Sequence, residues 1–257
     1  MIARLRAAGC VFAEDEADLL IAEATTPDRL DAMIEQRVTG LPLEQVVGWA
    51  EFRGLRIVVD AGVFVPRRRT EFLVEQAIGL APARAVVVDL CCGSGALGVA
   101  LAAAADVAEL HAADIDPREV ACARRNVEPA GGHVHLGDLF TPLPSGLRGR
   151  VDVLLCNVPY VPTSDIALLP AEARSYEPRV ALDGGTDGLD VLRRVLVDAP
   201  RWLAPTGALL VETSERQEPL AVAACTRAGL LARVASCDEL GATVLIATLP
   251  AGDVTAS

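Results

Sequence analysis

Residues 85–105 read AVVVDLCCGSGALGVALAAAA and combine three signals of one fold class. The stretch 85–90 is a short apolar run typical of a buried strand, and it leads directly into glycines. Residues 96–105 are strong helix formers, so a helix is expected immediately after the glycine turn. Strand, glycine turn and helix in this order are typical of the first unit of an open α/β sheet.

The same alternation continues toward the C-terminus. We expect further strands at 110–114, 133–136, 151–156, 207–212, 230–235 and 243–249, and helices at 117–126, 189–203 and 218–228. Strands that alternate with helices form a mostly parallel sheet covered on both faces. Only a short loop separates the last two strands, so these two are expected to pair antiparallel.

The chain before this sheet has a different pattern. Residues 1–45 read as helices, with one buried face formed by Leu30, Met33, Ile34 and Val38. Residues 49–65 are strand-like and carry turn signals at 53–54 and 60–62, which predicts a β-hairpin. We therefore expect two domains: a small helical domain with a β-hairpin linker over 1–66, and an α/β domain over 67–257.

Composition excludes several classes of function. The formal net charge is −12, and all 23 cationic side chains are Arg, because the chain contains no Lys. This excludes lysine Schiff-base chemistry and the P-loop lysine. An acidic body also disfavours direct nucleic-acid binding. The run Arg67-Arg68-Arg69 is the exception, and we expect it to meet an acidic partner surface.

Other features indicate a soluble cytoplasmic protein without a membrane partner. The apolar runs are too short to span a bilayer, and the N-terminus carries acid where a signal peptide needs an apolar core. Seven cysteines without a regular framework are typical of reduced thiols. His133 and His135 share a strand face but have no third ligand at a matching spacing, so no metal site is expected.

The glycine turn predicts a cofactor site. Ligands of open α/β sheets bind outside the carboxyl ends of the strands, where Cys91, Cys92, Gly93, Ser94 and Gly95 would lie against them. The segment 93–98 also matches G-x-G-x-x-G, and an acidic residue follows at about 20 residues. That pattern admits either a dinucleotide or S-adenosylmethionine, whose product is S-adenosylhomocysteine.

Three carboxylates and one leucine refine this prediction. Asp89, just before the turn, opposes a pyrophosphate but suits an α-amino group and a sulfonium, which favours S-adenosylmethionine. Asp114 ends the second strand and can accept from both ribose hydroxyls. Asp138 follows the third strand and is placed to accept from an adenine amino group, with Leu139 against the ring.

The fourth strand ends in Asn157-Val158-Pro159-Tyr160, which predicts the acceptor site. A planar nitrogen nucleophile needs its hydrogens held and its lone pair aimed at the methyl group. The Asn157 side-chain oxygen and the Val158 carbonyl can accept those hydrogens. Pro159 stiffens the turn, and Tyr160 can stack on the flat acceptor.

Four segments together carry a family resemblance: 42–55 (PLEQVVGWAEFRGL), 65–71 (VPRRRTE), 157–160 (NVPY) and 177–190 (EPRVALDGGTDGLD). They resemble the linker, the P-R-P-E-T-E segment, the N-P-P-Y motif and a late loop of the protein-(glutamine-N5) methyltransferases of the PrmC/HemK type. That family modifies the Gly-Gly-Gln loop of translation release factors. The resemblance covers nearly the whole chain.

The resemblance implies a class I, Rossmann-like S-adenosylmethionine-dependent methyltransferase with a seven-stranded sheet. By the same resemblance, residues 91–95, Asp114, Leu139 and Asn157 line the cofactor, and residues 157–160 hold the glutamine amide. The helical domain helps to dock the protein substrate, which is a release factor or another glutamine-bearing protein.

Departures from the family pattern leave alternatives open. Val158 replaces the first proline of N-P-P-Y, Cys91 replaces a glycine, and Arg68 and Arg69 replace Pro-Glu. One alternative is methylation of a small molecule or another planar nitrogen acceptor. A second is a cofactor-binding interaction protein that Val158 has weakened as a catalyst, and a third is a dinucleotide oxidoreductase.

Overall fold

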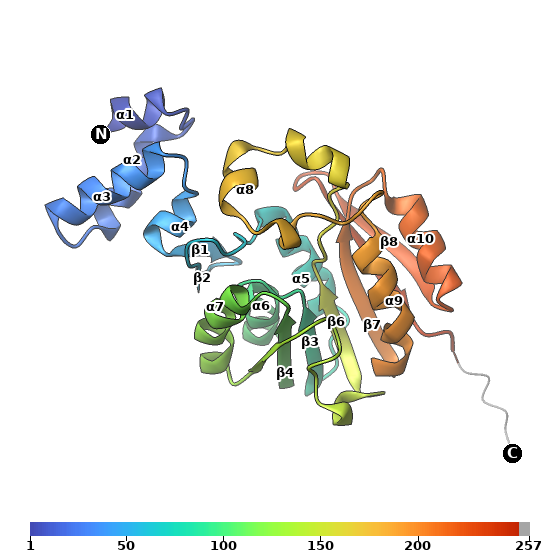
Figure 1. Cartoon of the computed structure of the whole chain (residues 1–257). Coiled ribbons are helices and arrows are strands. Elements are labelled where there is room, and N and C mark those ends of the chain that lie inside the picture. Colours follow the sequence, from blue (N-terminus) through green and yellow to red (C-terminus); the bar gives the residue numbers. More distant parts are fainter. Residues whose placement is uncertain (252–257) are drawn as a thin grey trace, which may run out of the picture.

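A seven-stranded sheet forms the centre of the larger part of the molecule in the computed structural model, which describes residues 1–251 (Figure 1). The strands are β3 (Ala85–Leu90), β4 (Val107–Asp114), β5 (His133–Leu136), β6 (Val151–Cys156), β7 (Leu203–Thr213), β8 (Leu231–Cys237) and β9 (Ala242–Thr248). Their order is β5-β4-β3-β6-β7-β9-β8. Among the strand pairs of this sheet within residues 1–251, only β7–β9 and β8–β9 are antiparallel. The predicted fold class and the antiparallel closing pair are confirmed.

Helices cover both faces of this sheet. Those on one face are α9 (Asp190–Trp202) and α10 (Glu218–Arg227), and those on the other include α5 (Glu71–Ile78) and α6 (Ala96–Ala104). A further helix, α7 (Pro117–Val127), packs on β4 and β5. All of these except α5 lie where helices were predicted. No helix within residues 1–251 is long and apolar enough to cross a membrane.

The N-terminal helices have a hydrophobic core of their own. They are α1 (Ile2–Ala7), α2 (Ala13–Glu23), α3 (Pro27–Val38) and α4 (Leu43–Val47), drawn in blue in Figure 1. Apolar side chains from all four helices meet in this core, where Met33 and Ile34 are buried and Leu30 and Val38 pack against it. The predicted helical face is confirmed. Thr26 caps α3 by accepting from the Arg29 N–H at 3.1 Å.

A β-hairpin links these helices to the sheet, as predicted. Its strands are β1 (Trp49–Phe52) and β2 (Leu55–Val58). Arg53 and Gly54 form the two-residue turn with φ of 50° and 73°, the backbone that the twist of a hairpin favours. Phe52 and Ile57 are buried in the core that α5 and α6 share, so the hairpin packs against the sheet domain's core.

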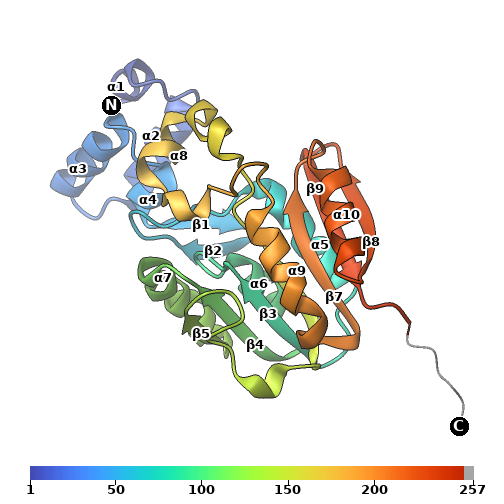
Figure 2. The same ribbon diagram turned by 45° about the vertical axis from the view of Figure 1, so that its right-hand side comes forward.

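The segment between β6 and α9, residues 157–189, returns to the N-terminal helices (Figure 2). It contains the short helix α8 (Ala171–Tyr176). Arg37 of α3 is buried and bonds Glu16 of α2 at 2.6 Å and Glu172 of α8 at 2.7 Å. The Tyr176 hydroxyl donates to the Thr39 carbonyl at 2.6 Å. This segment therefore connects the two parts of the molecule a second time.

Candidate active site

A cavity of about 440 Å³ lies at the carboxyl ends of β3, β4 and β6. Parallel strands bring their carboxyl ends to one edge, which is why residues far apart in sequence meet there. The remaining walls come from residues 157–189, the segment 64–70, α4 and the loop before it, the loop after β5, and side chains of α6, α7 and α9. Most of the predicted site residues line it: Cys91, Cys92, Gly93, Ser94, Asp114, Asp138, Leu139, Asn157, Val158, Pro159 and Tyr160.

Asp114 fixes the glycine loop. Its two carboxylate oxygens accept from the backbone N–H groups of Gly93 and Asp116, each at 3.0 Å. Burial raises the pKa of Asp114, and the two backbone hydrogen bonds oppose that shift. Cys91 and Gly93 both have positive φ, 52° and 55°, so the loop turns sharply at the end of β3 and exposes its backbone to the cavity.

Two predicted cofactor residues, Asp89 and Gly95, do not line the cavity. Asp89 is 1% exposed and lies under α6, where its Oδ2 accepts from the Gly98 N–H at 3.0 Å. Burial raises the pKa of Asp89 to about 8. At pH 7 the side chain therefore does not offer the negative charge on which the prediction of S-adenosylmethionine was based. Gly95 faces α7, and a Cβ there would lie 2.5 Å from Val127 Cγ2.

The segment Asn157–Tyr160 forms the wall next to the glycine loop. The Asn157 side-chain oxygen is buried and has no hydrogen-bond partner within residues 1–251. The Val158 side chain is 2% exposed and packs into the sheet core. The hydroxyl of Tyr160 donates to Glu212 Oε1 at 2.8 Å, and burial together with the Glu212 carboxylate raises its pKa, so the hydroxyl stays protonated.

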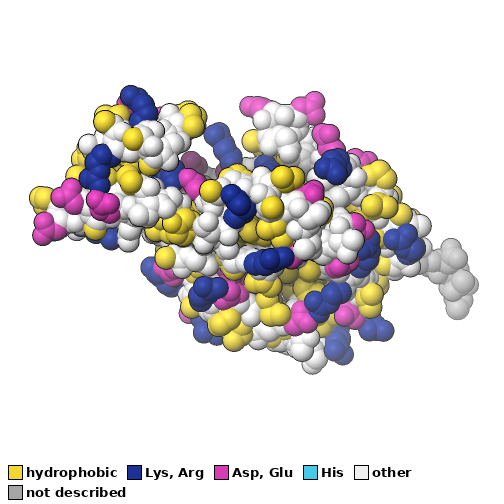
Figure 3. Space-filling model, turned by 45° about the horizontal axis from the view of Figure 1, so that its top comes forward, with side chains coloured by type: hydrophobic (Ala, Val, Ile, Leu, Met, Phe, Trp, Pro, Cys, Tyr) yellow, Lys and Arg dark blue, Asp and Glu magenta, His cyan; other side chains and the backbone are white. Residues whose placement is uncertain are grey.

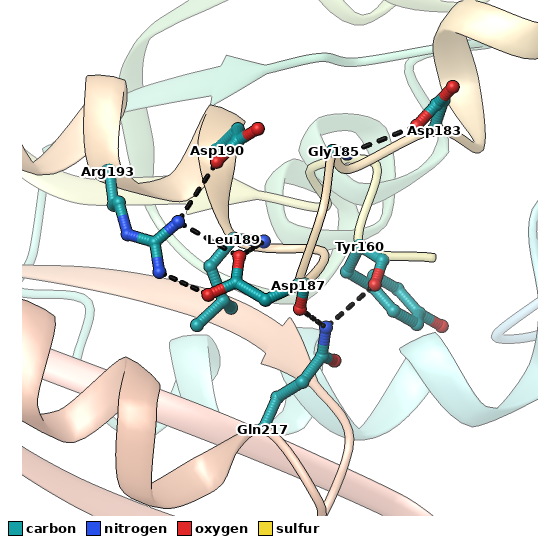
Figure 4. A network of polar contacts seen from close by, with 8 residues as sticks. All are labelled: Tyr160, Asp183, Gly185, Asp187, Leu189, Asp190, Arg193 and Gln217. Atoms are coloured by element: carbon teal, nitrogen blue, oxygen red, sulfur yellow. Dashed lines mark hydrogen bonds and ion pairs between the residues drawn. The ribbon is translucent and has the colours of Figure 1, made fainter. Parts of the chain in front are cut away.

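A polar network supports this segment from behind (Figure 4). Gln217 donates from Nε2 to the main-chain oxygens of Tyr160 at 2.8 Å and Asp187 at 2.9 Å. The Asp187 carboxylate in turn accepts from Arg193 at 2.9 Å and from the Leu189 N–H at 3.1 Å. The loop before α9 is thereby tied to the acceptor segment.

Two charged residues, Glu119 and Arg194, are among the cavity residues that the sequence did not reveal. Glu119 of α7 is 2% exposed, accepts from the Phe64 N–H at 2.9 Å, and has a pKa that burial raises to about 8. Its spacing after Asp116 matches an ordinary helix capping pattern, which concealed it. Arg194 of α9 pairs with Asp138, and no motif in the sequence marks it.

Two of the three arginines in the run Arg67–Arg69 are paired with carboxylates of this protein. Arg67 pairs with the buried Glu177, and Arg69 pairs with Glu212, so both guanidinium groups are already neutralised by carboxylates. Only Arg68 of the three is exposed without a partner within residues 1–251. Arg and acidic side chains are interspersed over the face in Figure 3. The sequence did not reveal these internal pairs because the carboxylates come from strands and loops far along the chain. Contact of the run with an acidic partner surface stays a prediction.

All three histidines of the chain meet on β4 and β5. His111 lies with its ring centroid 5.2 Å from that of His133 and 5.3 Å from that of His135. The third histidine next to His133 and His135, which the sequence spacing did not reveal, is therefore His111 on the adjacent strand β4. Burial and the neighbouring rings lower the pKa of His111. No group of three or more His, Cys, Asp or Glu within residues 1–251 is arranged to hold a metal ion.

Comparison with known proteins assigns the family. The model of the methyltransferase small domain matches residues 54–171. The release factor glutamine methyltransferase of Geobacter sulfurreducens is 41% identical over 217 residues, which cover 82% of this chain and 73% of that relative. The enzyme of the same description from Mycolicibacterium smegmatis is 35% identical over 246 residues, covering 88% and 86%. This chain belongs to the release factor glutamine methyltransferase family.

The family predicted from the four sequence segments is thus confirmed, and this methyltransferase uses S-adenosylmethionine as methyl donor. Solved structures agree on the fold. A methyltransferase from Pyrococcus furiosus superimposes with a TM-score of 0.56 at 18% identity, over 76% of this chain and 88% of that one. The ribosomal protein L11 methylase of Lactobacillus delbrueckii gives 0.53 at 16% identity, over 75% and 84%.

Proposed function

We propose that this methyltransferase methylates the side-chain amide nitrogen of a glutamine in a translation release factor. The observation that carries the proposal is the Asn157 side-chain oxygen, a buried acceptor without a partner in a cavity wall. A buried acceptor that lacks a donor costs free energy, so its position favours a ligand that donates an N–H group. A primary amide supplies that donor.

The cavity residues fit S-adenosylmethionine. Asp114 would accept from the ribose hydroxyls, and the backbone of residues 91–94 would lie along the rest of the nucleoside. Leu139 and Asp138 would contact the adenine. When bound, the cofactor supplies the methyl group on a positively charged sulfur. Asp89 is left out of this set because it is buried away from the cavity.

The acceptor segment would position the amide. The Asn157 side-chain oxygen and the Val158 carbonyl would each accept one amide hydrogen, which leaves the nitrogen lone pair aimed at the methyl group. The ring of Tyr160 would stack on the amide plane, and Pro159 would limit movement of the turn. The raised pKa of Tyr160 keeps its hydroxyl protonated, so it cannot take up a proton. The N–C bond would form as the S–C bond breaks, and the proton that the nitrogen loses would leave to solvent, so we expect positioning to supply most of the rate.

We also propose that residues 1–66 form a domain that helps to dock the protein substrate, and that residues 67–257 form the catalytic domain. Two observations support this division of roles. The N-terminal helices have a core of their own, and Pro42 and Glu44 from this part line the cavity. A bound protein could therefore contact both parts at once.

The test is mass spectrometry of purified release factors after incubation with this methyltransferase and S-adenosylmethionine. We expect one added methyl group on the glutamine of the Gly-Gly-Gln peptide, and none with the Asn157→Ala variant. Binding of S-adenosylhomocysteine, measured by calorimetry, should persist in that variant. If the wild type binds S-adenosylhomocysteine but leaves every release factor unmodified, the proposed acceptor is wrong.

A further inference from the structure

Tyr160 is anchored at both ends. Its main-chain oxygen accepts from Gln217, and Figure 4 shows its ring pointing away from that contact. At the far end of the ring, the hydroxyl donates to Glu212 Oε1 at 2.8 Å and accepts from the guanidinium of Arg69. The hydroxyl contacts come from β7 and from the segment before α5, so two distant elements fix one side chain of the cavity wall.

Arg69 joins these groups into a single cluster. Its Nε donates to the same Glu212 oxygen at 2.9 Å, and its guanidinium carbon lies 5.8 Å from the centre of the Tyr160 ring. The Glu212 side chain is only 3% exposed. A buried carboxylate needs a cation close by, so Arg69 offsets the burial of Glu212 and holds its Oε1 next to the Tyr160 hydroxyl.

The start of the acceptor segment has less support. The Val158 N–H makes no hydrogen bond within residues 1–251, and a valine leaves φ freer than a proline would. Core packing of the Val158 side chain, Pro159 and the anchors on Tyr160 therefore limit movement of this segment. The Gln217 contact holds the main chain of Tyr160, and Arg69 and Glu212 hold its hydroxyl.

We propose that Arg69 is a positioning residue that holds Glu212 and the Tyr160 hydroxyl in one arrangement and so fixes the wall of the acceptor slot. This inference rests on the proposed function of residues 157–160. Arg69 also lines the cavity, but its hydrogen bonds go to Tyr160 and Glu212, so we expect it to act through Tyr160. Its effect should therefore fall on turnover rather than on the binding of either substrate.

The first test is steady-state kinetics of Arg69→Ala with a release factor as acceptor. We expect kcat to fall about tenfold, with both KM values within about threefold, since misplaced acceptors lose rate more than affinity. The Arg69 side chain is 47% exposed, so added guanidinium ion can reach the vacated position and should restore kcat. Arg68→Ala removes the same charge one residue away and is the matched control. An unchanged kcat, or a loss without rescue, would overturn the inference.

A second experiment repeats the Arg69→Ala substitution in a protein that already carries Val158→Pro. Val158→Pro is compatible with the unbonded N–H and stiffens the segment independently. If Arg69 supplies rigidity, Arg69→Ala should cost only about threefold in that background instead of about tenfold. Equal losses in both backgrounds would contradict the proposal. Arg69→Lys, which keeps the charge but not the planar fork, replaces the alanine variant if that variant does not fold.

Hydrogen exchange gives a readout that needs no acceptor. Deuterium uptake of the peptide covering residues 157–160 should rise in Arg69→Ala and fall again with guanidinium ion. Uptake equal to that of the wild type would overturn the positioning role. A wild type that modifies no release factor would instead contradict the proposed function, and the exchange measurement would still decide the role of Arg69.

Discussion

A single oxygen atom carries the proposed recognition of the acceptor. The Asn157 side-chain oxygen is buried without a partner, and the chain keeps it at the end of β6 beside the glycine loop. We expect Asn157→Ala to lower methyl transfer by about 100-fold or more, because one positioned acceptor in a closed site contributes a few kcal/mol to transition-state binding. The measurement is single-turnover methylation of a release factor, with S-adenosylhomocysteine affinity as the control. Near-normal turnover would contradict the mechanism.

Asp89 makes a prediction about pH. Its pKa is about 8 in the folded protein against an ordinary value of 3.8, so between these values the folded state holds a proton that the unfolded state has released. Rising pH therefore lowers the free energy of unfolding, by at most about 1.4 kcal/mol per pH unit for this group. Asp89→Asn cannot titrate and should flatten that dependence. Urea unfolding between about pH 5 and pH 8 measures it.

The control for that experiment is Asp106→Asn, because Asp106 is exposed. It should keep the pH dependence of the wild type. Glu119, whose pKa is also about 8, is present in all three proteins and adds the same slope to each. Identical slopes in Asp89→Asn and the wild type would mean that Asp89 is ionised in the folded state.

Side-chain direction within a strand explains which site residues could be predicted. Residues 91–94 and Asn157 follow strand ends and Asp114 is the last residue of its strand, and strand ends can be located from apolar runs. Asp89 lies one residue before the end of β3, and its side chain is on the face of the strand that packs against α6. It therefore points away from the cavity. The sequence predicted the correct cofactor partly from a charge that burial suppresses. The cluster of Arg69, Glu212 and Tyr160 depends on tertiary contacts that no local pattern encodes.

At the scale of elements, the glycine turn between β3 and α6 depends on close packing against α7. Gly95 has φ of 80° and faces Val127, whereas Gly131 has φ of 81° and nothing within 4 Å of an added Cβ. Both alanine substitutions incur the left-handed backbone cost of about 1–2 kcal/mol, but only Gly95→Ala adds a steric term of about 1–3 kcal/mol. Urea unfolding of the two variants should show that difference. Equal losses would mean that α7 moves aside freely.

Element bounds were predictable where one face or both faces are buried. The bounds of β3 and β6 agree with the apolar runs, and α7 begins at its predicted proline. The bounds of β5 were also predicted correctly, although its four residues are half-buried or exposed. The strand β4 begins three residues earlier than expected, at Val107 rather than at 110, because its first residues are half exposed and lack a continuous apolar run. The helix α5 was missed; its N-cap residue is Thr70, whose side chain makes no capping hydrogen bond.

At the scale of the whole molecule, Arg37 joins the N-terminal helices to residues 157–189. It is 8% exposed and bonds the buried Glu16 as well as Glu172, whose side chain is 46% exposed. Arg37→Met would leave Glu16 buried without a cation, at a cost of about 3–5 kcal/mol. Glu172→Gln removes only the exposed partner and should cost about 1 kcal/mol or less. Urea unfolding of both variants checks this ranking, and a similar loss in both would contradict it.

The two tryptophans lie in different parts of this architecture. Trp49 is in the hairpin, with the Arg56 guanidinium 4.1 Å above its ring, and Trp202 ends α9 and stacks on Phe140 at 5.3 Å in the sheet core. Their emission spectra should therefore differ and respond to separate surroundings. Two single-tryptophan variants separate these signals: Trp49→Phe leaves only the emission of Trp202, and Trp202→Phe leaves only that of Trp49. Coincident emission changes in urea would show that linker and sheet unfold as one cooperative unit.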